Sequence, residues 1–217
     1  MNETVHLESI RAGALALPAE LIVPQDVAGV VLFAHGSGSS RRSARNRWVA
    51  RVLQGHRMAT LLFDLLTDDE ALQRRNTFDI ELLGGRVGQA IDWAEAQTSL
   101  AGLRIGLFGA STGAAAALSA DATRPGRVGA IVSRGGRPDL AADRLPNVAA
   151  PTLLIVGGAD TEVLALNRQA LRRLRCKKRL EVVPEATHLF EEPGAMGSVA
   201  ELAAAWFANH LTLRLVA

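Results

Sequence analysis

A serine between two glycines, preceded by an apolar run and followed by an alanine-rich one, constrains this chain more than any other feature. The run at residues 104–108 predicts a buried strand, and the run at 114–120 predicts a helix. Between them stands Gly109-Ala110-Ser111-Thr112-Gly113. So short a connection predicts a sharp turn with a strained backbone at the serine, and small neighbours relieve the crowding. The sequence therefore predicts a serine hydroxyl raised clear of a sheet edge, in front of a helix N-terminus.

Strands and helices alternate along the rest of the chain. Segments 4–10 and 14–22 alternate apolar with polar or small residues and predict an antiparallel pair at a sheet edge, where Pro18 would also be tolerated. Further strands are predicted at 27–34, 59–63, 128–133, 152–156 and 179–183, and helices at 45–54, 78–97, 164–175 and 198–209. This order predicts an α/β fold with a mainly parallel central sheet, helices on both faces and little or no lid. We expect one domain over residues 1–217.

Composition narrows the class of protein. A hydrophobic content of 48% fits a compact core. The net charge of +2 provides little field to attract nucleic acid, and basic residues are not interleaved with aromatic ones. We find no apolar run of the ~18 residues that a membrane span needs and no signal-peptide pattern at the start. A single cysteine excludes an internal disulfide. We therefore expect a cytoplasmic protein that binds neither nucleic acid nor membrane, with its oligomeric state left open.

A serine attacks a carbonyl only with a base to take its proton and a third group to orient that base. When Gly-x-Ser-x-Gly stands between a strand and a helix, these partners follow in the order acid, then histidine. Asp160 is the first acid after a strongly apolar strand downstream of Ser111. His188 follows the next strand, whereas His210 lies at the far end of the last helix. We therefore predict Ser111 as nucleophile, His188 as base and Asp160 as the orienting acid, all at the carboxyl edge of the sheet.

Each of the three residues also has a purely structural interpretation. Ser111 fits an ordinary turn, and His188 fits a packed core histidine. Asp160 fits the N-cap of the helix that follows it, which is a common position for aspartate. If Asp160 only caps that helix, the next acids to consider are Glu162 and Asp139.

The tetrahedral oxyanion formed by such an attack needs two hydrogen-bond donors. The backbone N–H of Thr112, the residue after the nucleophile, is the first. The second is expected in the loop His35-Gly-Ser-Gly-Ser-Ser40, whose small residues allow close approach to a ligand. We predict the N–H of Ser37, with Gly38 as the alternative, although the loop also fits a flexible turn. His35 precedes the elbow and so breaks the chain order, and we expect it to shape this turn.

Four segments of the chain form a recognisable set: His35-Gly-Ser-Gly-Ser-Ser, Asp64-Leu-Leu-Thr, Gly109-Ala-Ser-Thr-Gly and Ala186-Thr-His-Leu-Phe-Glu-Glu-Pro-Gly194. Together they resemble the dienelactone-hydrolase-like branch of the α/β-hydrolases, and the resemblance covers nearly the whole chain. It implies the α/β-hydrolase fold, and some relatives of this type are fused to phosphoribosyltransferase domains. Dienelactone hydrolases proper carry a cysteine at the elbow, where this chain has Ser111. The resemblance therefore implies the branch but not the dienelactone substrate.

Arginines supply most of the positive charge. Arg134 and Arg137 stand directly beyond a predicted strand, on the catalytic edge. Because a guanidinium clamps carboxylate or phosphate with two parallel hydrogen bonds, we predict that both bind substrate, with solvated surface charges as the alternative. The group at positions 41, 42, 45 and 47 is expected on a solvated helix face, and Cys176 is expected to be a passive surface thiol.

No metal-ligand spacing and no phosphate-binding loop of the P-loop type occurs in the sequence, so we predict neither a metal nor an organic cofactor. The expected function is that of a serine hydrolase acting on a small carboxylic ester, lactone or thioester through an acyl-enzyme. Two alternatives stay open. One is an acyltransferase that uses the same triad, and the other is an accessory or regulatory module with low turnover.

Overall fold

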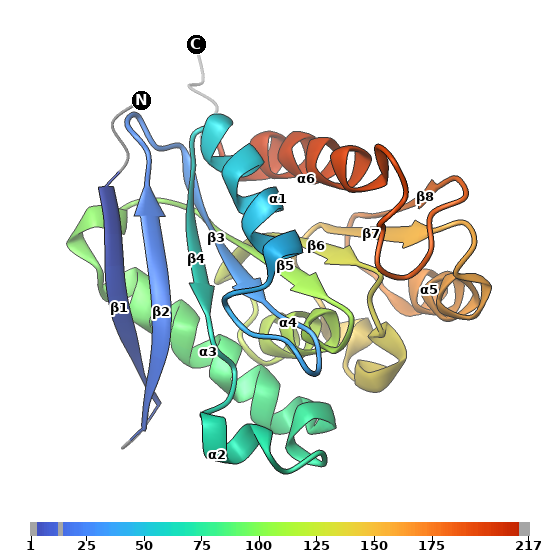
Figure 1. Ribbon diagram of the computed structural model, residues 1–217, viewed down its shortest axis with the longest axis horizontal. Helices are drawn as coiled ribbons and strands as arrows, with labels where there is room; N and C mark the ends of the chain where they lie inside the picture. The colour runs from blue at the N-terminus through green and yellow to red at the C-terminus, as the bar shows by residue number, and fades with distance from the viewer. Residues whose placement is uncertain (1–3, 13–14, 213–217) are drawn as a thin grey trace.

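The computed structural model describes residues 4–12 and 15–212, and it is built around one eight-stranded sheet (Figure 1). The strands are β1 (Thr4–Ala12), β2 (Leu15–Val23), β3 (Gly29–Ala34), β4 (Met58–Phe63), β5 (Ile105–Ala110), β6 (Val128–Arg134), β7 (Thr152–Gly157) and β8 (Lys178–Val183). Their order across the sheet is β1-β2-β4-β3-β5-β6-β7-β8. The pairs β1–β2 and β2–β4 are antiparallel, and every other pair is parallel. The predicted mainly parallel sheet is confirmed.

Helices cover both faces of this sheet (Figure 1). The α-helices are α1 (Ala44–Gly55), α2 (Asp68–Ala71), α3 (Ile80–Ala96), α4 (Thr112–Thr123), α5 (Thr161–Arg173) and α6 (Ala195–Leu211). The short 3-10 helices are η1 (Asn76–Phe78), η2 (Thr98–Leu100), η3 (Pro138–Ala141) and η4 (Leu145–Asn147). Helices α1 and α6 pack together on one face, while α3, α4 and α5 share the other.

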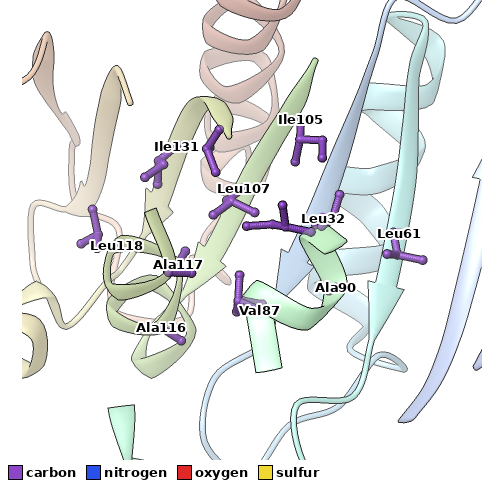
Figure 2. Packing of buried hydrophobic residues seen from close by; sticks show 14 of the residues in the cluster. Leu32, Leu61, Val87, Ala90, Ile105, Leu107, Ala116, Ala117, Leu118 and Ile131 are labelled. Atoms are coloured by element: carbon purple, nitrogen blue, oxygen red, sulfur yellow. The ribbon is translucent and has the colours of Figure 1, made fainter. Parts of the chain in front are cut away.

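The central strands are buried on both faces because helices cover both sides of the sheet. Alternate side chains of one strand therefore pack into opposite layers. Leu32 of β3 packs toward α3 and α4, whereas its neighbour Phe33 packs toward α1 and α6. Figure 2 shows the first of these layers, with Val87 of α3 and Ala117 of α4 against the sheet. Such continuous burial explains why these strands read as unbroken apolar runs.

The predicted antiparallel pair at a sheet edge is confirmed, with β1 outermost and β2 next to it. Pro18 lies in β2, which is the second strand of the sheet, between β1 and β4. The pairing of β2 with β4 begins only at Ala19, opposite Phe63, so at Pro18 the only ladder partner is β1. The missing N–H of proline therefore breaks no hydrogen bond to β4. Its carbonyl oxygen accepts from the N–H of Asp64 at 3.0 Å. Ala14, which the prediction also included, lies outside the described residues.

The segment between β4 and α3 carries structure that the hydrophobic pattern did not predict. Helix α2 is only four residues long, and η1 follows it. Thr67 caps α2 by accepting from the N–H of Glu70, whose carboxylate accepts in return from the N–H of Thr67. In Figure 1 this segment projects beyond the carboxyl end of β4. It thereby forms one wall beside the loop that follows β3.

Candidate active site

Ser111 stands in a strained turn between β5 and α4. Its backbone has φ 51° and ψ −120°, a region that residues other than glycine rarely occupy. A Cβ at Gly109 would lie 2.4 Å from the Cα of Ala114, and one at Gly113 would lie 2.2 Å from the carbonyl oxygen of Ala34. Larger residues at either position would therefore force the strand and helix apart. The steric reason that the sequence analysis gave for these two glycines is confirmed.

The end of β6 holds this turn in place. The N–H of Ser111 donates to the carbonyl oxygen of Arg134 at 3.2 Å, and the N–H of Arg137 donates to the carbonyl oxygen of Ser111 at 3.1 Å. Gly135, between these two arginines, lies against His188, since a Cβ there would be 3.5 Å from the ring carbon Cε1. One short segment thus contacts both the predicted nucleophile and the predicted base.

His188 and Asp160 form a close pair beyond the carboxyl ends of β8 and β7. The ring nitrogen Nδ1 of His188 lies 2.7 Å from Oδ2 of Asp160. The aspartate side chain is 13% exposed and the histidine 39%, so the ring can be reached from solvent. The N–H of Ala159 donates to the carbonyl oxygen of Ala186 at 3.0 Å, which ties the two loops together. The pair leaves Nε2 as the ring nitrogen that is free to accept a proton.

The structural interpretation of Asp160 is only half right. The residue occupies the N-cap position of α5, but its side chain makes no capping hydrogen bond and points to His188 instead. Of the two reserve acids, Asp139 is paired with Arg137. His210 donates from Nδ1 to the carbonyl oxygen of Trp206 at the far end of α6. Within the described residues Ser111 and His188 share no hydrogen bond. In many enzymes the hydrogen bond between nucleophile and base forms only when substrate binds.

The loop after β3 lies directly over the elbow. A Cβ on Gly36 would be 3.1 Å from the Cβ of Ser111. The N–H of Ser37, our predicted second oxyanion donor, donates to the Thr112 hydroxyl oxygen Oγ1 at 2.8 Å. Thr112 is 2% exposed and begins α4, so its own N–H has no acceptor within the helix. The predicted oxyanion residues are therefore neighbours that already contact each other.

The His35 ring holds the loop after β3 through two hydrogen bonds. Its Nε2 accepts from the N–H of Leu65 at 3.0 Å, so the proton of the neutral ring is on Nδ1, which lies 3.0 Å from the carbonyl oxygen of Gly36. Burial lowers the pKa of His35, although the hydrogen bond to Gly36 and the charge of Asp64 oppose this shift. The ring therefore joins the loops after β3 and β4, which agrees with its expected role in shaping the turn.

A cavity of about 310 Å³ opens beside this loop. Its walls are the oxyanion loop, the segment between β4 and α3, and single residues of α3 and α4; they include Ser37, Ser39, Ser40, Asp64, Leu65, Leu66, Asp68, Ala71, Thr77, Leu83 and Thr112. Asp64 forms an ion pair with Arg41 and also accepts from its N–H. No lysine or arginine is among the described residues that line the cavity. The hydrophobic pattern does not predict this wall, and the only local signal for α2 is the capping box of Thr67 and Glu70.

The two arginines proposed for substrate binding differ from each other. Arg137 donates to both carboxylate oxygens of Asp139, at 2.9 and 2.8 Å, and this hydrogen bonding raises its pKa. Arg134 is 7% exposed, pairs with no described acid, and has its Nε buried without a partner. Burial, together with the nearby charge of Arg45, lowers the pKa of Arg134 to about 10. Its guanidinium carbon lies 5.9 Å from the centre of the Phe190 ring.

The remaining features to consider are the single cysteine, possible metal ligands and possible membrane-spanning helices. Cys176 is half-buried rather than on the surface, and burial raises the pKa of its thiol. Within residues 4–12 and 15–212, no group of three or more histidine, cysteine, aspartate and glutamate side chains is arranged to hold a metal ion. None of the helices in these ranges combines the length and apolar character that crossing a membrane requires.

Known proteins resemble this chain in sequence and in fold. Residues 18–215 match the family model described as the dienelactone hydrolase family. The crystal structure of a dienelactone hydrolase from Anabaena variabilis is 52% identical, with a TM-score of 0.93 over 96% of this chain and 99% of that chain. Est1E from Butyrivibrio proteoclasticus is 15% identical, with a TM-score of 0.78 over 93% of this chain and 99% of that one, which is a likeness of fold alone. The fold is the α/β-hydrolase fold.

A longer protein also matches. A Mycobacterium tuberculosis (strain H37Rv) protein named "Putative phosphoribosyl transferase" is 56% identical over 200 residues, which are 92% of this chain and 45% of that protein. The chain thus spans about half the length of this curated relative. The match agrees with the fused architecture that the resemblance implied.

Proposed function

The chain belongs to the dienelactone hydrolase family, and on this premise we propose that it is a serine hydrolase that cleaves a small carboxylic ester, lactone or thioester. Family membership and the esterase-like fold support an ester-type hydrolase. The observation that carries the serine mechanism is the 2.7 Å contact between His188 and Asp160, on the same sheet edge as the strained Ser111 turn. We take residues 1–217 to act as one domain.

In the proposed mechanism, Oγ of Ser111 attacks the substrate carbonyl carbon while Nε2 of His188 takes the serine proton. Asp160 holds Nδ1–H of the ring and stabilises the imidazolium that forms. The carbonyl oxygen becomes an oxyanion held at the N-terminus of α4 by Thr112 and the Ser37 loop. His188 then protonates the leaving group, which departs. Water next attacks the acyl carbon while His188 takes its proton, and His188 returns that proton to Oγ of Ser111 as the acid is released.

Arg134 and Arg137 are proposed to favour a substrate with an additional negative group. Arg134 carries this part of the proposal, because a buried guanidinium without an acidic partner gains most from an incoming anion. Arg137 is already held by Asp139 and is expected to contribute less. A carboxylate or phosphate on the substrate would then lie beside β6, next to the nucleophile.

The experiment is a turnover measurement on a panel of esters, thioesters and lactones with wild type and Ser111→Ala. Ser111→Ala should keep its fold and lose roughly 10³-fold or more in kcat, because only binding and oxyanion effects remain. Alkylation of Cys176 is the matched control and should leave kcat unchanged. Full activity in a folded Ser111→Ala protein would refute the proposal. Transfer of the acyl group to an added nucleophile in preference to water would instead identify an acyltransferase.

A further inference from the structure

The hydroxyl of Thr112 is placed between the elbow and the loop that follows β3. It accepts a hydrogen bond from the N–H of Ser37 at 2.8 Å, and the side chain is almost completely buried. A threonine hydroxyl can accept two hydrogen bonds and donate one. Because Ser37 uses an acceptor position, the hydroxyl proton is directed elsewhere, and no described residue accepts it. Thr112 also lines the cavity, so this proton can face a ligand there.

The backbone N–H of the same residue is the first donor of the oxyanion site. It lies at the first position of α4, where the helix supplies no acceptor and the helix dipole favours negative charge. The amide and hydroxyl of one threonine can therefore converge on one oxygen atom. The N–H of Ser37 would strengthen the second bond, since donation into a hydroxyl oxygen makes its proton a better donor.

We propose that the Thr112 side chain is a catalytic residue, which donates its hydroxyl proton as a hydrogen bond to the oxyanion. This deepens the proposed function and rests on it. When the bond from Ser111 Oγ to the carbonyl carbon forms, the C=O electron pair moves to oxygen and the serine proton moves to His188. The oxyanion then accepts from the N–H and from Oγ–H of Thr112, which keeps its proton throughout. When the leaving-group bond breaks, the C=O double bond re-forms and His188 protonates the departing atom.

In this proposal Ser37 is not the second oxyanion donor that the sequence predicted. Its N–H acts through the Thr112 hydroxyl rather than directly on the oxyanion, because the 2.8 Å hydrogen bond already occupies it. Ser37 is therefore a positioning residue, and Thr112 supplies both donors.

The test compares Thr112→Val, which removes the hydroxyl with little change of shape, with Thr112→Ser, which keeps it. On 4-nitrophenyl acetate, Thr112→Val should lose roughly 10²-fold in kcat with KM nearly unchanged, as expected for a lost oxyanion donor. Thr112→Ser should retain most of kcat. Affinity for a trifluoromethyl ketone, which forms an oxyanion adduct with Ser111, should fall in Thr112→Val by the same factor as kcat/KM. If Thr112→Val fails to fold, Thr112→Ala serves in the same comparison.

Three results would overturn the inference: an unchanged kcat in Thr112→Val, equal losses in the valine and serine variants, or a raised KM with unchanged affinity for the ketone. The last would indicate that the hydroxyl only anchors the loop. Ser111→Ala, measured in parallel, separates this inference from the proposed function. If Ser111→Ala is inactive while Thr112→Val is fully active, only the role of Thr112 is wrong. If Ser111→Ala keeps its activity, the nucleophile assignment fails and the role of Thr112 fails with it.

Discussion

The two sides of Ser111 along the sheet edge differ in chemistry. Beyond β3 and β4 lies the cavity, lined by hydroxyls, leucines and carboxylates. Beyond β6, β7 and β8 lie the paired His188 and Asp160, together with the buried Arg134. We call the first the cavity side and the second the basic side. Ser111 at the end of β5 stands between them.

From this contrast we expect the two sides of Ser111, our proposed nucleophile, to have different roles. The cavity side offers volume, apolar walls, hydroxyl groups and carboxylates, so it suits a portion of a substrate that carries no negative charge. The basic side offers His188, our proposed base, and a guanidinium without an acidic partner, so we expect the proton transfers and an anionic portion of the substrate there. Each variant below is directed at one side and spares the other.

Removing His188 should have the largest effect on the basic side. His188→Ala should lower kcat by roughly 10³-fold or more and abolish the rise of activity with pH, because only neutral imidazole accepts a proton. His210→Ala is the matched control and should change neither the rate nor the pH profile. Initial rates across a pH series check both variants. If His210→Ala proves to be the inactive one, the base has been assigned wrongly.

Removing Arg134 should have an intermediate effect that depends on substrate charge. Arg134→Ala should weaken kcat/KM by ~1.5–3 kcal/mol for an ester or lactone carrying a second anionic group, the range for hydrogen bonds to charged groups. A neutral ester of the same size should be barely affected. Arg134→Lys should recover only part of the loss, because lysine keeps the charge without the planar fork. Arg137→Ala should cost less than Arg134→Ala, since Asp139 already holds Arg137.

Equal losses of kcat/KM on neutral and anionic substrates would contradict the anion preference. They would instead indicate that Arg134 supports the loop at the end of β6, whose backbone holds Ser111.

Acidification should weaken the loops on the cavity side through His35. Burial lowers the folded-state pKa of His35 below its ordinary value of 6.5, so the unfolded chain binds the extra proton more readily. This contribution to stability is present above pH 6.5 and is lost as the pH falls toward the folded pKa, by about 1.4 kcal/mol per pH unit between the two values. Denaturant unfolding of wild type and His35→Gln across this range should show a smaller decline in the variant. Parallel declines would contradict the assignment.

Neutralising Asp68 should have the smallest effect. Asp68 lines the cavity but is exposed, so its charge is screened. Asp68→Asn should raise kcat/KM by about two- to five-fold for esters whose negatively charged group enters the cavity, and leave neutral esters unchanged. If Asp68→Asn raises kcat/KM by a larger factor than Arg134→Ala lowers it, then the cavity side, not the basic side, sets the charge preference.

The sequence predicted the sheet and the elbow because their signals are local. Continuous apolar runs identified β3 to β7, and the glycines at 109 and 113 have the steric role expected of them. Chain order singled out Asp160 and His188, which the fold brings within 2.7 Å. Their catalytic roles, like that of Ser111, stay predictions.

What the sequence did not predict depends on contacts between distant segments. The four-residue helix α2 is too short to show a helical period, although its capping box was readable. The hydrogen bond from Ser37 to Thr112 joins residues 75 positions apart. Arg134 and Arg137 look alike in the sequence, but only the fold buries one and pairs the other with Asp139. The sequence also did not show that β2 pairs with β4 only from Ala19 onward, which leaves Pro18 paired with β1 alone.

Covalent labelling tests the central assignment most directly. The protein is treated with a fluorophosphonate and digested, and the modified peptide is identified by mass spectrometry. Our account predicts one adduct, on Ser111, that forms far more slowly in His188→Ala and is absent from Ser111→Ala. An adduct on another residue, or undiminished labelling of the Ser111→Ala protein, would contradict the assignment of Ser111 as the nucleophile between the two sides.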